Sequence, residues 1–413
     1  MKKQSNTPHI RFQNYEDEWD VEKLKNIFGT IRNAFVGTAS PYYVEKGNFY
    51  LESNNVKNGK INYDSQIFIN DEFYEKQKDK WLKTNDIVMV QSGHVGHTAV
   101  IPEELNNTAA HALIVFTDYK EEVEPHFLNY QFQSNGKRKE LDLISTGNTI
   151  KHILASEMKN FKMDFPTVDE QSAIGSLFRT LDDLLASYKD NLANYQSIKV
   201  AMLSKMFPKV GQTVPEIRLD GFEGEWKKAK LKDVAHRVQG NDGRMDLPTL
   251  TISASGGWMN QIDRFSANIA GKEQKNYTLL KKGELSYNHG NSKLAKYGVV
   301  FELKEYEEAL VPKVYHSFRV NQLADAKFIE IMFSTKIPDR ELGKLVSSGA
   351  RMDGLLNISF DDFMNIAIII PTFAEQQAIG AYFSNLDNLI NSYQEKISQL
   401  ETLKKKLLQD MFI

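Results

Sequence analysis

The most constraining feature of this sequence is that it contains the same segments twice. Residues 8–25 (PHIRFQNYEDEWDVEKLK) return as residues 215–232 (PEIRLDGFEGEWKKAKLK), with 9 of 18 positions identical. Residues 165–208 return as residues 370–413, with 17 of 44 positions identical, and both copies carry a Met-Phe pair near their end. The offsets of 207 and 205 residues are nearly equal, so one unit of this length occurs twice in the chain.

Between these repeated segments the two copies differ almost completely. The span from Trp19 to Pro166 covers 147 positions and the span from Trp226 to Pro371 covers 145. Only short stretches match, such as Ser-Thr-Gly at 145–147 beside Ser-Ser-Gly at 347–349. A duplicated structural protein is expected to diverge everywhere. Constant flanks around two unlike inserts of similar size instead indicate two different recognition modules.

Composition places the chain among ordinary globular proteins. Its 413 residues predict two or three domains, with 41% apolar and 25% charged residues. The absence of cysteine excludes a thiol nucleophile, a cysteine-ligated zinc and disulfides, and is compatible with a reducing cytoplasm. We find no signal peptide and no apolar stretch long enough to cross a bilayer, so we expect a cytoplasmic protein without a membrane partner. A net charge of −3 means that any nucleic-acid binding must rest on something other than bulk charge.

The second repeated segment predicts a long helix in each copy. Thr167 with Glu170, and Thr372 with Glu375, have the spacing of a capping box. The apolar residues that follow keep a heptad-like spacing, and those assigned to the interface are Ile174, Phe178, Leu181, Leu185, Tyr188, Ile379, Phe383, Leu386, Ile390 and Tyr393. About 38 residues give each helix a length of roughly 57 Å. Two equivalent helices pair most simply about a two-fold axis, which makes them antiparallel; the alternative is that each lies on its own domain.

The segments between the repeats mix short strands with helices. The predicted fold class is therefore α+β, with two α/β lobes joined by two long antiparallel helices that form a coiled coil, related by a pseudo-two-fold internal repeat. The predicted division is residues 1–165 for the first lobe, 166–208 for the first helix, 209–370 for the second lobe and 371–413 for the second helix. A rod of this kind suits a reader of two separated half-sites on DNA, where the same groove face recurs every ~34 Å.

Polar loops in both lobes carry the residue types that contact nucleic acid. Arg, Lys, Asn and Gln read base edges, while Ser, Thr and backbone amides bind phosphates. The candidates in the first lobe are Ser92, His94, His97, Thr98, Lys137, Arg138, Lys139, Thr146, Asn148 and Lys151. Those in the second lobe are Gln239, Asn241, Arg244, Asn288, His289, Asn291, Lys293, Lys296, Tyr297, Ser348 and Arg351. For any one of these loops, a solvated turn without a ligand remains the alternative.

Sequence signals for catalysis are weak. The chain has no phosphate-binding G-x-x-x-x-G-K-[ST], no G-x-G-x-x-G and no H-E-x-x-H. It also lacks a G-x-S-x-G elbow and the Asn/Asp-Pro-Pro-Tyr/Phe element of adenine methyltransferases. His94 and His97 have a spacing that metal ligands use, but no carboxylate is near them in the sequence, so we expect no metal and no catalytic residue.

These features together resemble the specificity (S, or HsdS) subunit of a Type I restriction-modification system. The resemblance is carried by the Pro-x-Ile-Arg entry at Pro8 and Pro215, by the Pro-Thr-x-x-Glu-Gln-x-Ala-Ile-Gly entry at Pro166 and Pro371, and by the heptads after each. It covers nearly the whole chain. Each motif alone is weak, but their combined order is specific.

The resemblance implies a function and a set of partners. Each lobe would be a target-recognition domain that reads one half of a bipartite double-stranded DNA sequence, and the helices would set the gap between the halves. The helices would also dock two methyltransferase (M) subunits, and two motor-nuclease restriction (R) subunits would complete the complex. S-adenosylmethionine, ATP and Mg would bind to those partners, and this chain would hold no cofactor and catalyse no reaction.

Two other function classes remain open at this point. One is a coiled-coil adaptor that scaffolds proteins without DNA, and the other is a DNA-modifying enzyme with unrecognised motifs. The bases of each half-site and the length of the gap are not deducible from the sequence, because readout depends on side-chain placement and on DNA shape.

Overall fold

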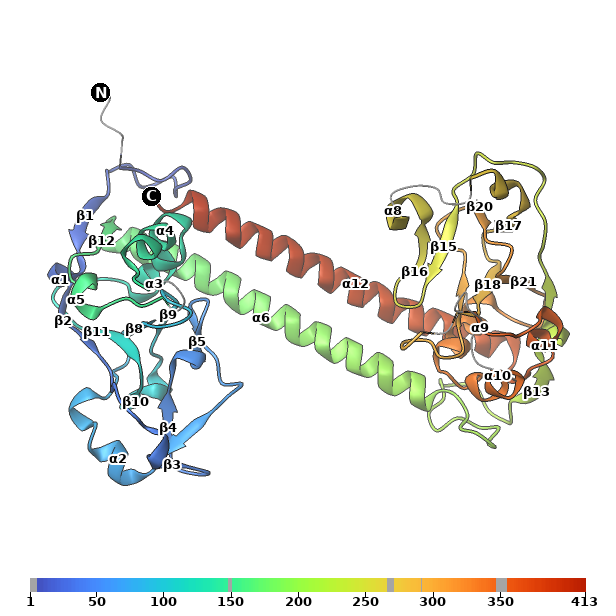
Figure 1. Ribbon diagram of the computed structural model, residues 1–413, viewed down its shortest axis with the longest axis horizontal. Helices are drawn as coiled ribbons and strands as arrows, with labels where there is room; N and C mark the ends of the chain where they lie inside the picture. The colour runs from blue at the N-terminus through green and yellow to red at the C-terminus, as the bar shows by residue number, and fades with distance from the viewer. Residues whose placement is uncertain (1–5, 148–150, 266–270, 291, 347–354) are drawn as a thin grey trace. The chain divides into compact units, whose positions relative to one another are not determined.

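The computed structural model describes residues 6–147, 151–265, 271–290, 292–346 and 355–413. The chain divides into two compact units, the first made of residues 1–190 with 395–413 and the second of residues 191–394. Both boundaries fall inside the long helices α6 (Val168–Lys205) and α12 (Phe373–Asp410). Each unit therefore combines one lobe with the start of one long helix and the end of the other (Figure 1).

The first lobe is built around a four-stranded antiparallel sheet in the order β2-β11-β8-β9. Its inner face packs on helix α3, and Ile87, Phe116 and Phe127 are among the side chains buried between them. The elements of this core are β2 (Phe28–Asn33), β8 (Ile87–Val90), β9 (Thr98–Val100), β11 (Leu113–Tyr119), α1 (Leu24–Ile27), α3 (Pro125–Gln133), α4 (Asn135–Ile144) and α5 (Ala155–Met158). The strand pair of β1 (Asp20–Lys23) with β12 (Lys162–Phe165) joins the entry of the lobe to its exit.

A second sheet extends the first lobe on its other side. Its order is β10-β4-β7-β3, and a short hairpin of β5 and β6 lies apart from it. The bounds are β3 (Tyr43–Val44), β4 (Asn48–Leu51), β5 (Val56–Lys57), β6 (Lys60–Ile61), β7 (Ile67–Ile69), β10 (Ala109–Ala110) and α2 (Asp71–Glu75). Separate apolar clusters hold this part together, one of them centred on Tyr50 and Phe73.

The second lobe repeats the first core almost element for element. Its sheet has the order β14-β21-β18-β19, and β13 pairs with β22 as β1 pairs with β12. The elements are α7 (Leu231–Val234), α9 (Ala326–Ser334), α10 (Asp339–Leu345), α11 (Phe360–Met364), β13 (Lys227–Lys230), β14 (Ala235–Arg237), β18 (Leu285–Asn288), β19 (Val299–Glu302), β21 (His316–Val320) and β22 (Ala367–Ile370). The inserts that share almost no sequence thus share a core fold.

The additional part of the second lobe is different from that of the first. In place of a four-stranded sheet it has two antiparallel pairs, β15 with β16 and β17 with β20. The bounds are β15 (Leu250–Ser253), β16 (Gly257–Asn260), β17 (Thr278–Lys281), β20 (Glu308–Val311) and α8 (Gln261–Phe265). The α+β fold class and the internal repeat predicted from the sequence are confirmed.

The starts of both long helices follow the predicted caps only in part. Thr167 and Thr372 cap the helices, because their Oγ1 atoms accept the backbone N–H of Glu170 and Glu375 at 3.4 Å. The two glutamate side chains do not reach back to the cap as a capping box requires. Each glutamate instead forms a bidentate ion pair with an arginine of the first repeated segment, Glu170 with Arg11 and Glu375 with Arg218.

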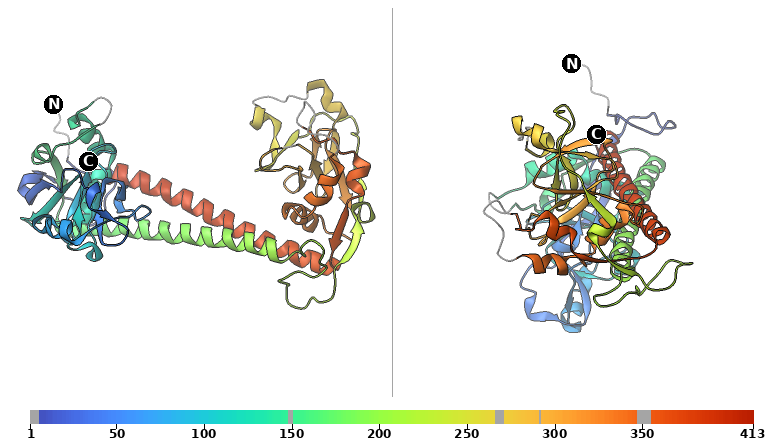
Figure 2. Two further views of the ribbon diagram at one scale, coloured as in Figure 1. Left: turned by 60° about the horizontal axis from the view of Figure 1, so that its bottom comes forward. Right: turned by 90° about the vertical axis from the view of Figure 1, so that its right-hand side faces the viewer.

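Each long helix is followed, two residues after its end, by a phenylalanine that completes a lobe core. In the first unit Phe412 contacts the rings of Trp19 and Phe127, with centroids 6.4 and 5.6 Å away. In the second unit Phe207 contacts Trp226 and Phe328 at 5.7 and 5.6 Å. Figure 2 shows the C-terminus beside the first lobe, and the backbone N–H of Ile10 donates to the carbonyl of Asp410 there. The Met-Phe repeats are therefore core residues.

Within each unit the two long helices run antiparallel. In the first unit Asp182 pairs with Lys404 at 2.6 Å and Lys189 pairs with Glu401 at 2.6 Å. In the second unit the Tyr195 and Tyr393 rings lie 5.5 Å apart. The numbers on one helix rise as those of its partner fall, which confirms the predicted antiparallel arrangement.

The predicted interface stripe has two roles along each helix. Ile174, Phe178 and Leu181 pack into the first lobe core, and Phe178 also stacks on Phe412 at 5.8 Å. The equivalent residues of α12 are Ile379, Phe383 and Leu386, which pack into the second core. Further along the helices, Leu185 and Ile390 are buried. The Lys396 ammonium lies over the Tyr188 ring, and the Tyr393 ring contacts the Tyr195 ring. The first turns of the stripe therefore pack into the lobe cores, and further along Tyr188 and Tyr393 contact the other long helix.

Among the described residues, no helix combines the length and apolar character that a membrane span requires.

Candidate nucleic-acid interface

In both lobes the loop between the last two strands of the core sheet pairs with the segment that follows a helix. In the first lobe the β8–β9 loop is joined to the segment after α4 by a bridge between Ser92 and His152. In the second lobe the β18–β19 loop is joined to the segment after α10 by a bridge between Gly290 and Leu355. The structure thus brings together two loops that are about fifty residues or more apart in sequence, and it does so at the same place in each fold.

Backbone hydrogen bonds fix the loop pair of the first lobe. The N–H of Gly93 donates to the carbonyl of Lys151 at 3.1 Å, and the N–H of Ile153 donates to the carbonyl of Gln91 at 2.9 Å. Thr146 bridges to His152 as well. The side chains of Thr146 and Lys151 remain exposed, although the Lys151 ammonium pairs with Asp142 at 2.8 Å. The predicted residues Ser92, Thr146 and Lys151 therefore lie on one surface.

Cationic groups surround His97 on this surface. Burial lowers the pKa of His97, and the charges of Arg138, His94 and Lys57 lower it further. Its Nδ1 accepts the backbone N–H of Asn58 at 3.1 Å, which leaves the proton of the neutral ring on Nε2. The His94 ring lies 6.1 Å from that of His97. A phosphate placed here would meet several donors at once, since Arg138 and Lys139 are exposed on α4.

The sequence reasoning missed the hairpin that completes this cluster. Lys57, Asn58, Gly59 and Lys60 form its turn, with φ of 51° at Asn58 and 83° at Gly59. Two consecutive residues with positive φ are typical of a type I′ turn, for which Asn-Gly is the strongest sequence signal. That signal was present in the chain and could have identified the hairpin, although not the loop it packs against.

Two of the first-lobe candidates lie inside the protein. The Thr98 hydroxyl donates to Asn129 at 2.8 Å and has no exposed surface. The Lys137 ammonium pairs with Asp164 at 2.8 Å and with Glu140 at 3.3 Å, and its side chain is only 5% exposed. Neither side chain can contact DNA in this conformation, so we leave both out of the proposed interface.

The second lobe places its candidates in two groups. Lys293 and Lys296 are exposed on the β18–β19 loop, and the Lys296 ammonium lies 5.3 Å from the centre of the Tyr297 ring. Asn288 positions the start of this loop, because its side chain donates to the carbonyl of Ile252 and accepts the N–H of Gly290. His289 is buried, with its ring nitrogens 2.7 and 2.9 Å from two backbone carbonyl oxygens. We therefore keep Lys293, Lys296 and Tyr297 and leave His289 out.

The 239–244 loop contacts strands β17 and β20. The carbonyl of Gly240 accepts the N–H of Leu279 in β17, and Asn241 donates to the carbonyl of Arg244. The Arg244 guanidinium pairs with Asp242 at 2.8 Å and with Glu308 of β20 at 2.6 Å. Gln239 is exposed. These residues belong to the β17–β20 side of the lobe.

Four candidates, Asn148, Asn291, Ser348 and Arg351, lie outside the described residues. In the described part of the chain no three His, Asp or Glu side chains are grouped so that they could hold a metal ion.

With this geometry in view, comparisons with known proteins define the class of the chain. The profile of the family described as "Type I restriction modification DNA specificity domain" matches residues 16–194 and again residues 223–402. Together these matches cover most of the sequence and one match falls on each repeat. The chain belongs to this family.

Individual relatives are distant. The chain is 24% identical over 279 residues to the Type I restriction enzyme MjaVIII specificity subunit of Methanocaldococcus jannaschii, covering 63% of this chain and 64% of the relative. It is 22% identical over 210 residues to the EcoBI specificity subunit of Escherichia coli, covering 49% of this chain and 44% of the relative. The matches thus span less than two thirds of these relatives.

Similarity of fold extends further than similarity of sequence. The crystal structure of the Type I restriction-modification system S subunit from M. genitalium superposes with a TM-score of 0.59 at 14% identity. The superposition covers 98% of this chain and 99% of that one. At this identity the likeness establishes the fold.

Proposed function

We propose that this chain is the DNA specificity subunit of a Type I restriction-modification complex. Each lobe reads one half of a bipartite double-stranded target, using the paired loops around Ser92 and His152 in the first lobe and around Gly290 and Leu355 in the second. The single observation that carries the proposal is that one core fold occurs twice and supports, at one equivalent place, two loop pairs of unlike sequence. A protein that reads two different half-sites needs such a division between constant and variable parts.

The same proposal assigns roles to the helices and to the partners. Because α6 and α12 each contribute residues to both units, we assign them the task of fixing the gap between the half-sites. Two methyltransferase subunits dock on the helices, and two restriction subunits complete the complex. S-adenosylmethionine, ATP and Mg bind to these partners in the cytoplasm, and this chain performs recognition without catalysis.

Exchange of one lobe tests the proposal directly. The chain is produced with its methyltransferase subunits, and residues 20–165 are replaced by the corresponding lobe of a relative. Sequencing of methylated host DNA should show a changed first half-site with an unchanged second half-site and gap. A single contiguous site, no sequence preference, or unchanged methylation would contradict a reader and favour an adaptor.

A second measurement addresses catalysis. Labelled methyl groups are offered to the isolated chain and to the assembled complex with the same DNA. We expect transfer only by the complex. Transfer by the chain alone would identify it as an enzyme.

Point variants separate phosphate contacts from base contacts. Arg138→Ala should weaken binding to all sequences alike and reduce the slope of log affinity against log salt by about one. Lys46→Ala, at an exposed cation on the turn between β3 and β4, is the matched control and should leave the slope unchanged. Loss of preference at a single base in Arg138→Ala would instead assign this arginine to base readout.

A further inference from the structure

The two units contain equivalent positions beside the long helices, but among the described residues only the position in the first unit is filled. The equivalence follows from the repeats and from helices α3 and α9. Glu124 and Asp325 cap these helices, and the N–H of each cap residue donates to the glutamine that follows Glu170 or Glu375. Alignment from these caps makes Asn129 and Gln133 of α3 equivalent to Glu330 and Ser334 of α9.

In the first unit the β5–β6 hairpin fills the position. The carbonyl of Gly59 accepts a hydrogen bond from Asn129 at 2.9 Å, and a Cβ atom at Gly59 would come within 2.2 Å of the Gln133 side chain. Gly59 also bridges to Ala99 of the edge strand β9. The turn therefore lies between α3 and the edge strand of the core sheet, and only glycine fits at position 59.

The same hairpin reaches the long helices. The Lys60 ammonium lies 3.9 Å from the Asp182 carboxylate and donates to its backbone carbonyl at 3.4 Å. Asp182 also accepts hydrogen bonds from Tyr130 at 2.8 Å and Lys404 at 2.6 Å. Its side chain is consequently only 8% exposed.

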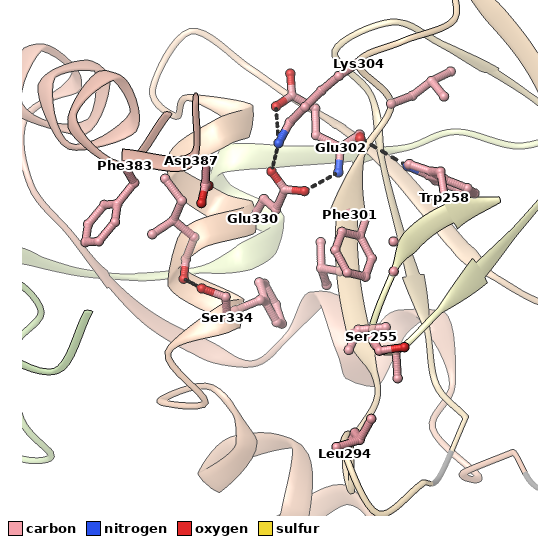
Figure 3. A pocket seen from close by; sticks show the side chains of 18 of the residues that line it. Ser255, Trp258, Leu294, Phe301, Glu302, Lys304, Glu330, Ser334, Phe383 and Asp387 are labelled. Atoms are coloured by element: carbon pink, nitrogen blue, oxygen red, sulfur yellow. Dashed lines mark hydrogen bonds and ion pairs between the residues drawn. The ribbon is translucent and has the colours of Figure 1, made fainter. Parts of the chain in front are cut away.

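In the second unit the equivalent position is an open pocket of about 700 Å³. Figure 3 shows Phe383 and Asp387 of α12 on one side, Trp258 with Phe301 on the other, and Glu330 and Ser334 of α9 between them. Asp387 is the repeat counterpart of Asp182, and the lysine it pairs with, Lys199, is the counterpart of Lys404. The Asp387 side chain is 47% exposed, against 8% for Asp182.

The pocket combines apolar walls with four carboxylates and three lysines, namely Glu302, Glu305, Glu330, Asp387, Lys199, Lys304 and Lys336. Trp258, Phe301 and Leu294 line it, and Leu294 is 69% exposed. Among the described residues the buried Oε2 of Glu302 has no hydrogen-bond partner, although Lys304 lies 4.0 Å away and itself pairs with Glu330. A cationic group entering the pocket would supply the donor that this carboxylate oxygen lacks.

We propose that this pocket docks a β-turn of a partner polypeptide that carries a lysine or arginine. The partner turn is the intermolecular counterpart of the Lys57–Lys60 turn of the first unit. Its backbone lies along the edge strand β19 over α9, and its cation pairs with the exposed Asp387. β19 is the edge strand of its sheet, and an edge can be extended by backbone pairing. The N–H and the carbonyl of Glu302 already bond to Glu330 and Trp258, so the partner turn pairs with the rest of this edge. This inference does not depend on the proposed reading of DNA.

The chain itself supplies the probe for a test. A cyclic peptide with the sequence of residues 55–62 (NVKNGKIN) presents the turn in a fixed conformation, which lowers the entropic cost of binding. The full chain is labelled with fluorotryptophan, and its four tryptophan signals are followed by NMR during titration. We expect the Trp258 signal to shift with a dissociation constant of ~1 mM or tighter. The signals of Trp19 and Trp226, which are buried in the two cores, should not move.

Variants of the peptide and of the protein make the test specific. A peptide with both lysines replaced by serine should bind about three- to tenfold more weakly, and Asp387→Asn should weaken the native peptide by a similar factor. Ser334→Trp should abolish binding by filling the pocket. Ser204→Trp, at an exposed position of α6 outside the pocket lining, is the matched control and should bind as the unmodified chain does.

Several outcomes would overturn the inference. An unshifted Trp258 signal at millimolar peptide, or equal binding of the serine peptide, would show that the pocket does not recognise a basic turn. Displacement of the peptide by a DNA duplex would assign the pocket to nucleic acid. Self-association that Ser334→Trp removes in sedimentation experiments would identify a second copy of the chain as the occupant.

Discussion

The two units of this protein are built on one core and differ in what surrounds it. Both have the same strand order, the same arginine–glutamate pair at the start of the long helix and the same tryptophan–phenylalanine contacts at the end of the other. They differ in the sheets added to the core and in the position beside Asp182 or Asp387, which is filled in one unit and open in the other. The ion pairs and ring contacts that recur involve the repeated segments, whereas the additional sheets belong to the inserts that differ in sequence.

The largest expected effect concerns the aromatic residue that each helix delivers to a core. Phe412→Ala should destabilise the first unit by about 3–5 kcal/mol, because the ring is buried against Trp19 and Phe127 and its removal leaves a cavity. Phe207→Ala should cost the second unit a similar amount. Hydrogen exchange measured unit by unit checks this, and each variant should expose only its own core. Equal loss of protection in both units would mean that the units do not unfold independently.

The sequence predicted the repeated features well because their signals are local. Thr167 and Thr372 were recognisable as caps, and the apolar spacing after them revealed the two long helices. The tertiary contacts of these helices were not predictable from local signals. Glu170, for example, forms its ion pair with an arginine that lies 159 positions earlier in the chain. The common core of the two lobes was also hidden, because a buried strand position accepts many apolar side chains and so keeps the fold while losing identity.

The candidate interface shows the same limit. The sequence predicts the loops at 91–98 and 145–151 as contact candidates, but only the structure shows that residues of the two segments pair. Composition does not determine which way a side chain points, so the prediction includes Thr98, Lys137 and His289, which the structure shows to be buried. Their polar groups serve the fold by satisfying carboxylate, amide or carbonyl partners in the interior.

A smaller effect should come from the buried arginine–glutamate pairs. Glu170→Gln should lower the free energy of unfolding by about 2–4 kcal/mol. The Arg11 side chain is only 13% exposed, and the substitution removes the carboxylate that neutralises its guanidinium. Glu375→Gln should cost nearly the same, since Arg218 is 15% exposed and binds in the same way. Chemical denaturation of both variants checks this. If the two variants differed in their loss of stability by well over 1 kcal/mol, the two ion pairs would contribute unequally despite their equal geometry.

His111 in the first unit and His316 in the second should contribute to the pH dependence of stability with opposite signs. In the first unit Glu52 raises the pKa of His111 through a contact of 3.2 Å. A raised pKa stabilises the fold below the ordinary value of 6.5, and this contribution is lost as the pH rises through the folded-state pKa. In the second unit burial lowers the pKa of His316 to about 4. Its contribution is present above 6.5 and is lost as the pH falls from 6.5 towards 4.

Unit-resolved hydrogen exchange between mildly acidic and mildly basic pH measures both contributions. For His316 the contribution is at most about 3 kcal/mol, since one pKa unit corresponds to ~1.4 kcal/mol. His111→Gln should flatten the alkaline loss in the first unit only, and His316→Gln the acidic loss in the second only. An acidic loss in the second unit that persists in His316→Gln would have to come from its carboxylates.

The smallest expected effect is the most direct measure of the filled and open positions. Asp182→Asn should cost about 2 kcal/mol, because the buried carboxylate accepts hydrogen bonds from both Tyr130 and Lys404. Asp387→Asn should cost less than about 1 kcal/mol, because this half-exposed carboxylate pairs with Lys199 at the surface. Thermal unfolding of the two variants measures the difference between their losses of stability. Lys60→Ser, which removes the contact of the hairpin with Asp182, should make this difference smaller. If Asp387→Asn were as costly as Asp182→Asn, the carboxylate would already be fully engaged within its own unit and would have little to offer a partner. A small cost leaves its charge available for the docking that we infer.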